Sequence, residues 1–186
     1  MSANPSLRRI CLVGVRGVGK TTLIRSLLPD LPMMDYVVGS AILRELAGEA
    51  FAQFDSLPPD VKQRYREDAI RWMERRQERT GRHILCDGHT TLLNPSTRQA
   101  EQVFTQLDCN FFRELILLEA PAEVVLQRRR DDPSKRRNLD SELLREELAG
   151  ERAACYRIAR THGMQAHELP VGDDLAITYR LKELLT

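Results

Sequence analysis

Between a short apolar run and a helix-like segment, the chain reads Gly14-Val15-Arg16-Gly17-Val18-Gly19-Lys20-Thr21. This order matches the spacing Gly-x-x-x-x-Gly-Lys-[Ser/Thr], and the strand-to-helix context is the one that the pattern requires. Its glycines let the backbone curl so that successive N–H groups point at phosphate oxygens, and the helix N-terminus adds positive potential. The segment therefore predicts a phosphate-binding loop for a nucleoside triphosphate.

Two side chains of this loop have expected roles of their own. Lys20 neutralises the β and γ phosphates, and Thr21 ligates a magnesium ion. The loop itself does not distinguish hydrolysis, phosphoryl transfer or nucleotide sensing, because all three use it. The expected contacts to the cofactor, Mg²⁺ with ATP, are Gly14, Arg16, Gly17, Val18, Gly19, Lys20, Thr21 and Thr22.

The pattern around the loop predicts one α/β domain over residues 1–186. With 186 residues, 42% of them hydrophobic, the chain is long enough for one such core and too short for two. Short apolar runs alternate with helix-like stretches, which is typical of a parallel sheet covered by helices. The apolar runs are residues 10–13, 33–38, 84–86, 115–118 and 166–169. The expected helices are residues 21–28, 40–53, 59–80, 98–107, 122–130, 141–161 and 175–184.

The overall charge gives no attraction to nucleic acid or to an anionic membrane. Lys and Arg number 28 against 27 Asp and Glu, so the net charge is +1. Residues 1–9 are polar and lack the apolar core of a signal peptide, which predicts a cytoplasmic protein. Cys11, Cys86, Cys109 and Cys155 are scattered, and we expect buried, reduced thiols.

A second candidate group follows the apolar run 84–86. Asp87 lies at the carboxyl end of a predicted buried strand, where parallel sheets place residues that contact ligands. Its carboxylate would hold magnesium through water, although an Asp before Gly also caps turns. His89 would contact a phosphate or the metal shell, and a hydrogen-bonded structural histidine is the alternative.

The segment 128–137 is densely basic and is expected to be an exposed loop between two helices. Phosphoryl transfer needs cations that close over the developing charge and exclude water. The alternative is an ordinary solvated run of charge. The cations are Arg128, Arg129, Arg130, Lys135, Arg136 and Arg137.

With these motifs in order, the chain resembles the nucleoside monophosphate kinase group, and most closely the archaeal type of adenylate kinase. There a D-x-H motif follows the third strand and a short arginine-rich lid follows the fourth. A helix with a Glu and a later Arg comes next, as Glu146 and Arg152 do here. The resemblance is carried by residues 14–21, Gly39-Ser40, Leu43-Arg44, Cys86-Asp87-Gly88-His89, Leu117-Leu118-Glu119-Ala120, Arg128 and Arg137-Asn138.

The resemblance implies a three-layer P-loop NTPase fold with a five-stranded parallel sheet flanked by helices. It also implies a helical monophosphate-binding region at about residues 39–80 and a short arginine-rich lid at about 128–139. Gly39, Arg44 and His89 would bind the acceptor, and Lys20, Asp87, Arg128 and Arg137 would act on the transferring group. Thr21 and Asp87 would hold the metal.

Three functions fit these motifs. The first is phosphoryl transfer from ATP to a nucleoside monophosphate, with AMP as the favoured acceptor. The second is a kinase for a hydroxyl group of a small metabolite, with Asp87 as base. The third is an ATP-dependent switch or assembly factor. The expected partners are small-molecule nucleotides rather than nucleic acid or membrane, and the oligomeric state stays open. Asp87-Gly88-His89 lacks the Pro-Arg that follows in common adenylate kinases, which leaves the acceptor undecided.

Overall fold

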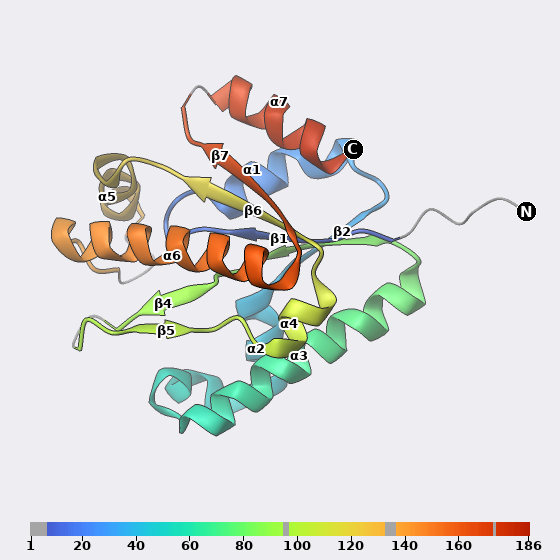
Figure 1. The fold of residues 1–186 in the computed structure, drawn as a ribbon, viewed down its shortest axis with the longest axis horizontal. Helices are drawn as coiled ribbons and strands as arrows, with labels where there is room; N and C mark the ends of the chain where they lie inside the picture. The colour runs from blue at the N-terminus through green and yellow to red at the C-terminus, as the bar shows by residue number, and fades with distance from the viewer. Residues whose placement is uncertain (1–6, 95–96, 133–136, 173) are drawn as a thin grey trace, which may run out of the picture.

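The computed structural model describes residues 7–94, 97–132, 137–172 and 174–186 (Figure 1). Five parallel strands form its central sheet, in the order β2-β3-β1-β6-β7. They are β1 (Arg9–Val13), β2 (Met34–Val38), β3 (His83–Asp87), β6 (Glu114–Glu119) and β7 (Gln165–Pro170). The five-stranded parallel sheet expected from the sequence is confirmed, with strand ends within a residue or so.

Helices cover both faces of the sheet because successive residues of each buried strand point to opposite faces. On β1, Ile10 and Leu12 pack into one apolar layer, and Cys11 and Val13 pack into the other. The first layer is closed by α1 (Lys20–Leu27), α5 (Ala122–Asp131) and α7 (Asp174–Leu185). The second layer is closed by α2 (Gly39–Ala47), α3 (Pro59–Thr80), α4 (Gln106–Phe111) and α6 (Ser141–His162).

The strand order places a ligand site at one edge of the sheet. β1 lies between β3 and β6, and the strand order reverses there. In open parallel sheets, ligands bind outside the carboxyl ends of the strands at such a reversal. The carboxyl end of β1 runs directly into the glycine-rich loop, and the end of β3 carries Asp87.

Helix ends follow the local sequence closely. α3 begins at Pro59 and stops at Gly81, which adopts the left-handed conformation with φ 63°. Asp140 caps α6, since its carboxylate accepts hydrogen bonds from the backbone N–H groups of Glu142 and Leu143. The predicted helix 40–53 is only partly correct, because α2 ends at Ala47 and a 3₁₀ segment, η2 (Gly48–Ser56), follows. A second short 3₁₀ turn is η1 (Leu28–Asp30).

The predicted helix 98–107 is wrong. Its first part is strand β5 (Ala100–Gln102), which pairs antiparallel with β4 (Thr91–Leu93), and α4 starts only at Gln106. The hairpin lies alongside α6 (Figure 1). Glu101 is held by Lys62 and Arg66 of α3, at 3.0 and 2.8 Å. These distant contacts outweigh the weak local preference for helix.

No helix among the described residues is long and apolar enough to cross a membrane.

Candidate functional site

The glycine-rich loop has a backbone that side chains would obstruct. Gly14 has φ 147°, and a Cβ there would lie 2.5 Å from the carbonyl oxygen of Leu118. Gly19 has φ 110° at the start of α1, and a Cβ there would lie 2.8 Å from the guanidinium of Arg128. Gly14 therefore needs glycine for conformation and for space, whereas Gly19 needs it for conformation, because the Arg128 side chain can move aside.

Lys20 is buried inside the curl of this loop. Its Nζ donates to the carbonyl oxygen of Gly14 at 2.5 Å and lies 3.7 Å from Oδ1 of Asp87. Burial lowers the pKa of Lys20, while the charges of Asp87 and Glu151 oppose that shift. Lys20 is thus placed beside the phosphate-binding backbone, and two carboxylates partly oppose the effect of its burial.

The structure brings together the two residues expected to hold magnesium. Thr21 donates through Oγ1 to Oδ2 of Asp87 at 2.6 Å, and Tyr36 donates to the same oxygen at 3.3 Å. Burial, and then the charge of Asp87, raises the pKa of Tyr36 to about 12, so its hydroxyl stays protonated. A hydroxyl and a carboxylate are oxygen donors of the kind that Mg²⁺ prefers, so the side chains present fit this ion.

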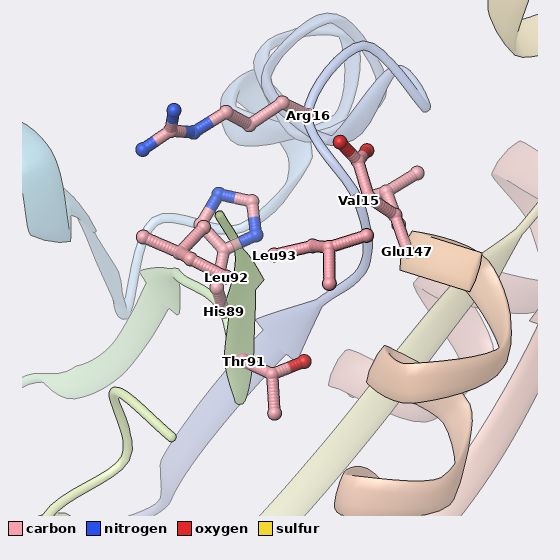
Figure 2. Close-up of a pocket in the computed structure, with 7 residues that line it drawn as sticks. All are labelled: Val15, Arg16, His89, Thr91, Leu92, Leu93 and Glu147. Atoms are coloured by element: carbon pink, nitrogen blue, oxygen red, sulfur yellow. The ribbon is translucent and has the colours of Figure 1, made fainter. Parts of the chain in front are cut away.

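His89 lies next to the loop in a small cavity of about 40 Å³ (Figure 2). Its Nδ1 is buried without a hydrogen-bond partner among the described residues, and it lies 4.0 Å from Oε1 of Glu151. Burial, followed by the charges of Lys20 and Arg16, holds the pKa of His89 well below its ordinary value. The imidazole is therefore neutral near pH 7.

Glu151 of α6 is a site residue that the sequence analysis missed. Its carboxylate is buried and accepts hydrogen bonds from the backbone of Gly14 and from both Thr90 and Thr91. In sequence it is one of several acids on a highly charged helix. No local signal separated it from its solvated neighbours.

One cleft of about 1500 Å³ collects nearly all of the predicted site residues. The exception is Gly14, the first residue of the loop, whose backbone N–H donates a hydrogen bond to Glu151. Gly39 lines the cleft where α2 begins, and Arg44, one helical turn on, stacks 4.8 Å over the ring of Phe51. The predicted residues that line it are Arg16, Gly17, Val18, Gly19, Lys20, Thr21, Thr22, Gly39, Arg44, Asp87, His89, Arg128 and Arg137.

Away from the glycine-rich loop, the same cleft is lined by residues that no motif indicated. Phe104 and Phe112 are buried there, with ring centroids 5.7 Å apart. Asp108 also lines the cleft, and its Oδ2 accepts hydrogen bonds from the backbone N–H and the hydroxyl of Thr105. Burial raises the pKa of Asp108 to about 6. Aromatic surface and a carboxylate thus share this part of the cleft.

The basic segment is less exposed than expected. Arg128, Arg129 and Arg130 belong to helix α5, and Arg129 is buried, bound to Glu147 at 2.5 Å and to the carbonyl of Arg16. Arg129 therefore anchors the glycine-rich loop, so that part of the predicted exposed loop is wrong. Lys135 and Arg136 lie outside the described residues.

Arg128 and Arg137 do reach the loop. Arg128 donates to the carbonyl of Val18. The guanidinium of Arg137 lies 3.3 Å from the position that a Cβ at Gly17 would take, and it pairs with Asp132 at 3.3 Å. Both predicted cations are thus within reach of a phosphate bound on the loop.

Two residues that carried the family resemblance lie elsewhere. Glu146 pairs with Arg98 of the hairpin, and Arg152 pairs with Glu119 and Glu168. Neither residue lines the cleft. Their contacts tie α6 to the hairpin and to the sheet.

Solved structures with this fold include several kinases. A sugar kinase from Janibacter sp. HTCC2649 is 18% identical with a TM-score of 0.61, over 96% of this chain and 94% of that one. Shikimate kinase from Acinetobacter baumannii, in complex with shikimate, is 16% identical with a TM-score of 0.63, over 97% and 93%. Shikimate kinase from Bacteroides thetaiotaomicron is 16% identical with a TM-score of 0.56, over 96% and 98%. At such identities the likeness shows the fold alone.

Sequence comparison adds the family. No curated protein sequence matches this chain. A family profile described as "AAA domain" matches residues 13–145, from the end of β1 into α6. Because this match spans well over half of the chain and includes the glycine-rich loop, Asp87 and Arg128, the chain belongs to the AAA domain family.

Proposed function

We propose that this protein transfers the γ-phosphoryl group of Mg²⁺-ATP to a nucleoside monophosphate. The observation that carries the proposal is one continuous cleft with two chemically different parts. One part is the glycine-rich loop with Lys20, Thr21 and Asp87. The other is formed by α2, η2, α3 and α4, and it combines aromatic rings with arginines. This combination suits a flat base joined to a phosphate.

The acceptor part supplies a partner for each portion of a nucleotide. Arg44 lines the cleft near the start of α2, where it would pair with the acceptor phosphate. Phe51, which is only partly buried and lines the same cleft, offers aromatic surface for the base. AMP is the acceptor that we favour, in keeping with the family resemblance.

The chemistry asks for positioning and charge rather than for a base. A monophosphate acceptor is already ionised, so no proton needs to be removed before attack. Lys20, Arg128 and Arg137 would stabilise charge on the transferring group, and Thr21 and Asp87 would hold the metal. Held by Thr21 and Asp87, Mg²⁺ would neutralise negative charge on the phosphate groups.

A second candidate is a kinase for a hydroxyl group of a small metabolite. It is favoured by the shared fold with a sugar kinase and with shikimate kinases. Asp87, at the end of β3, would then be the candidate base, although its oxygens already serve Thr21, Tyr36 and Lys20. That engagement leaves less of its carboxylate for an acceptor, so we rank this function second.

One assay separates these functions. The protein is incubated with Mg²⁺-ATP and each of AMP, CMP, UMP, GMP and dTMP, then with shikimate and a panel of sugars, and nucleoside diphosphate, ADP and free phosphate are measured. A Lys20→Ala variant purified in parallel reports any contaminating kinase. New diphosphate from one nucleotide supports the proposal. ADP formed only with a metabolite supports the second candidate, and phosphate release without an acceptor indicates an ATPase switch.

A further inference from the structure

Glu151 is the most heavily hydrogen-bonded buried acid next to the cleft. Its side chain is 3% exposed. Oε1 accepts from the backbone N–H of Gly14 at 3.1 Å and of Thr90 at 3.0 Å. Oε2 accepts from the N–H of Thr91 at 2.7 Å and from the hydroxyls of Thr90 and Thr91 at 2.7 and 3.0 Å. Each of these five donor groups points at one carboxylate.

The donor set matches a carboxylate side chain. A carboxylate only accepts hydrogen bonds, so it can receive every one of these N–H and O–H groups. A glutamine would place its own NH₂ group against at least one backbone N–H, and that donor would lose its partner. Lys20 also places a positive charge near Glu151. The five N–H and O–H dipoles differ from that charge in pointing directly at the carboxylate oxygens.

The two segments that Glu151 joins carry opposite sides of the phosphate site. Gly14 is the first residue of the glycine-rich loop. Thr90 and Thr91 lie just beyond Asp87 and His89, where the chain leaves β3 for the hairpin. One side chain from α6 thus bridges these two segments, in addition to the pairing of β1 with β3 and the contact between Thr21 and Asp87.

We infer that Glu151 is a positioning residue for nucleotide binding, which holds the glycine-rich loop in register with the segment that carries Asp87. It acts through Gly14, Thr90 and Thr91 rather than by touching the nucleotide. The inference rests on the proposed function only in that the loop binds Mg²⁺-nucleotide. It does not depend on which acceptor is used.

Binding of Mg²⁺-AMPPNP, measured by isothermal titration calorimetry without any acceptor, tests this role. For Glu151→Gln we expect the Kd to rise about tenfold, the effect of one lost hydrogen bond in a buried network. Glu146→Gln is the matched control, because it removes an exposed carboxylate from the same helix and should leave the Kd within about twofold. Circular dichroism confirms the fold of each variant.

A merely structural role gives a different result. It would lower the fraction of binding-competent protein, and hence the calorimetric stoichiometry, while the Kd of the remaining molecules stayed at the wild-type value. That outcome overturns the inference. If Glu151→Gln fails to fold, the Kd of Thr90→Val, which removes one hydroxyl donor, is measured instead. A raised Kd supports the inference, and an unchanged Kd overturns it.

The inference and the proposed function fail separately. If the protein phosphorylates no nucleoside monophosphate, the proposed function is wrong. If Glu151→Gln nevertheless weakens Mg²⁺-AMPPNP binding, Glu151 remains a positioning residue. Full phosphotransferase activity with wild-type affinity in Glu151→Gln would support the proposed function and overturn the inference.

Discussion

Lys20 shows how a single buried charge is kept available for chemistry. Burial lowers the pKa of Lys20, and the charges of Asp87 and Glu151 partly offset that shift. Thr21 and Asp87 contact each other close to Lys20, so the two proposed metal ligands and the cation share one corner of the cleft. The local field is therefore assembled from three elements, α1, β3 and α6.

Replacing Lys20 with methionine should abolish transfer while keeping the fold. The methionine fills the space of the aliphatic stem but carries no charge. In the wild type that charge would stabilise phosphate oxygens where water is excluded, so we expect the kcat of the variant to fall at least about 100-fold. Initial rates of ADP formation measure the effect, and thermal melting checks the fold. Lys182→Met, at an exposed lysine of α7, is the control and should keep wild-type rates. Comparable losses in both variants would contradict the assigned role.

Asp108 should make stability depend on pH. Its pKa is raised to about 6 by burial, so the folded state holds this proton more tightly than the unfolded chain does. The stabilisation is fully present below about pH 4 and is lost as pH rises through about 6. We expect the wild-type free energy of unfolding to fall by about 2 kcal/mol relative to Asp108→Asn over that window.

Urea unfolding of the two proteins at matched pH values isolates this one carboxyl, because all other groups are shared. The asparagine carbonyl can still accept from Thr105, so the start of α4 should survive the change. Parallel stability curves from pH 4 to pH 7 would show that the group at position 108 does not titrate in this range.

At the scale of elements, α3 is fastened to the edge strand β2 by one ion pair. Arg76 holds the buried Asp35 through two hydrogen bonds, at 2.6 and 2.9 Å. The same pairing raises the pKa of Arg76. The long helix that forms one wall of the acceptor part is thus positioned by a charged contact as well as by apolar packing.

Arg76→Ala should lower the free energy of unfolding by about 2 kcal/mol, because it leaves the carboxylate of Asp35 buried without its cation. Chemical denaturation measures the change. Arg75→Ala, on the exposed side of the same helix turn, is the control and should stay within about 0.5 kcal/mol of wild type. An equally small effect for Arg76→Ala would mean that Asp35 is resolvated and that the pair does not secure α3.

Elements with a strong local pattern were predictable from the sequence. Four strands of the central sheet contain short apolar runs, whereas β7, which includes His167 and Glu168, gave a weaker signal. α3 combines an early proline with Gly81 at its end, so its bounds followed from the cap residues. The β4–β5 hairpin was not predictable in this way. Ala100 to Gln102 has no alternating pattern, and its pairing with Thr91 to Leu93 depends on α3 and α6, which are distant in sequence.

The site residues also fall into those that local sequence predicts and those that only tertiary packing places. The glycine-rich loop and Asp87 follow from the spacing of residues along the chain. Glu151, Asp108 and Phe104 belong to the site because helices packed far along the chain bring them there. The exposure of Arg129 was predicted wrongly. Its basic neighbours favour an exposed lid, but its own side chain is buried. Burial of single charged residues is decided by tertiary contacts.

For the whole molecule, the strand order determines where the cleft lies. β1 delivers the glycine-rich loop, β3 delivers Asp87, and both strands end at the same edge of the sheet, where the order reverses. Residues of the region between β2 and β3 line one part of the cleft, and Arg128, Asp132 and Arg137, which follow β6, line another part. A ligand that spans this cleft would contact several elements of the fold. Its binding should therefore raise the free energy of unfolding of the whole molecule.

Nucleotide binding should therefore stabilise the whole protein, and should do so most strongly with the metal. At a ligand concentration 100 times the Kd, linkage gives about 2.7 kcal/mol, which for a chain of this length corresponds to a rise in Tm of roughly 5–10 °C. Differential scanning fluorimetry with Mg²⁺-AMPPNP measures this, with AMPPNP plus EDTA and the Lys20→Met variant as controls. Both controls should show a much smaller rise, because each removes positive charge from the phosphate oxygens. An equal shift in Lys20→Met would place the bound nucleotide away from the glycine-rich loop and would remove the basis for assigning Thr21, Asp87, Arg128 and Arg137 to the transferring group.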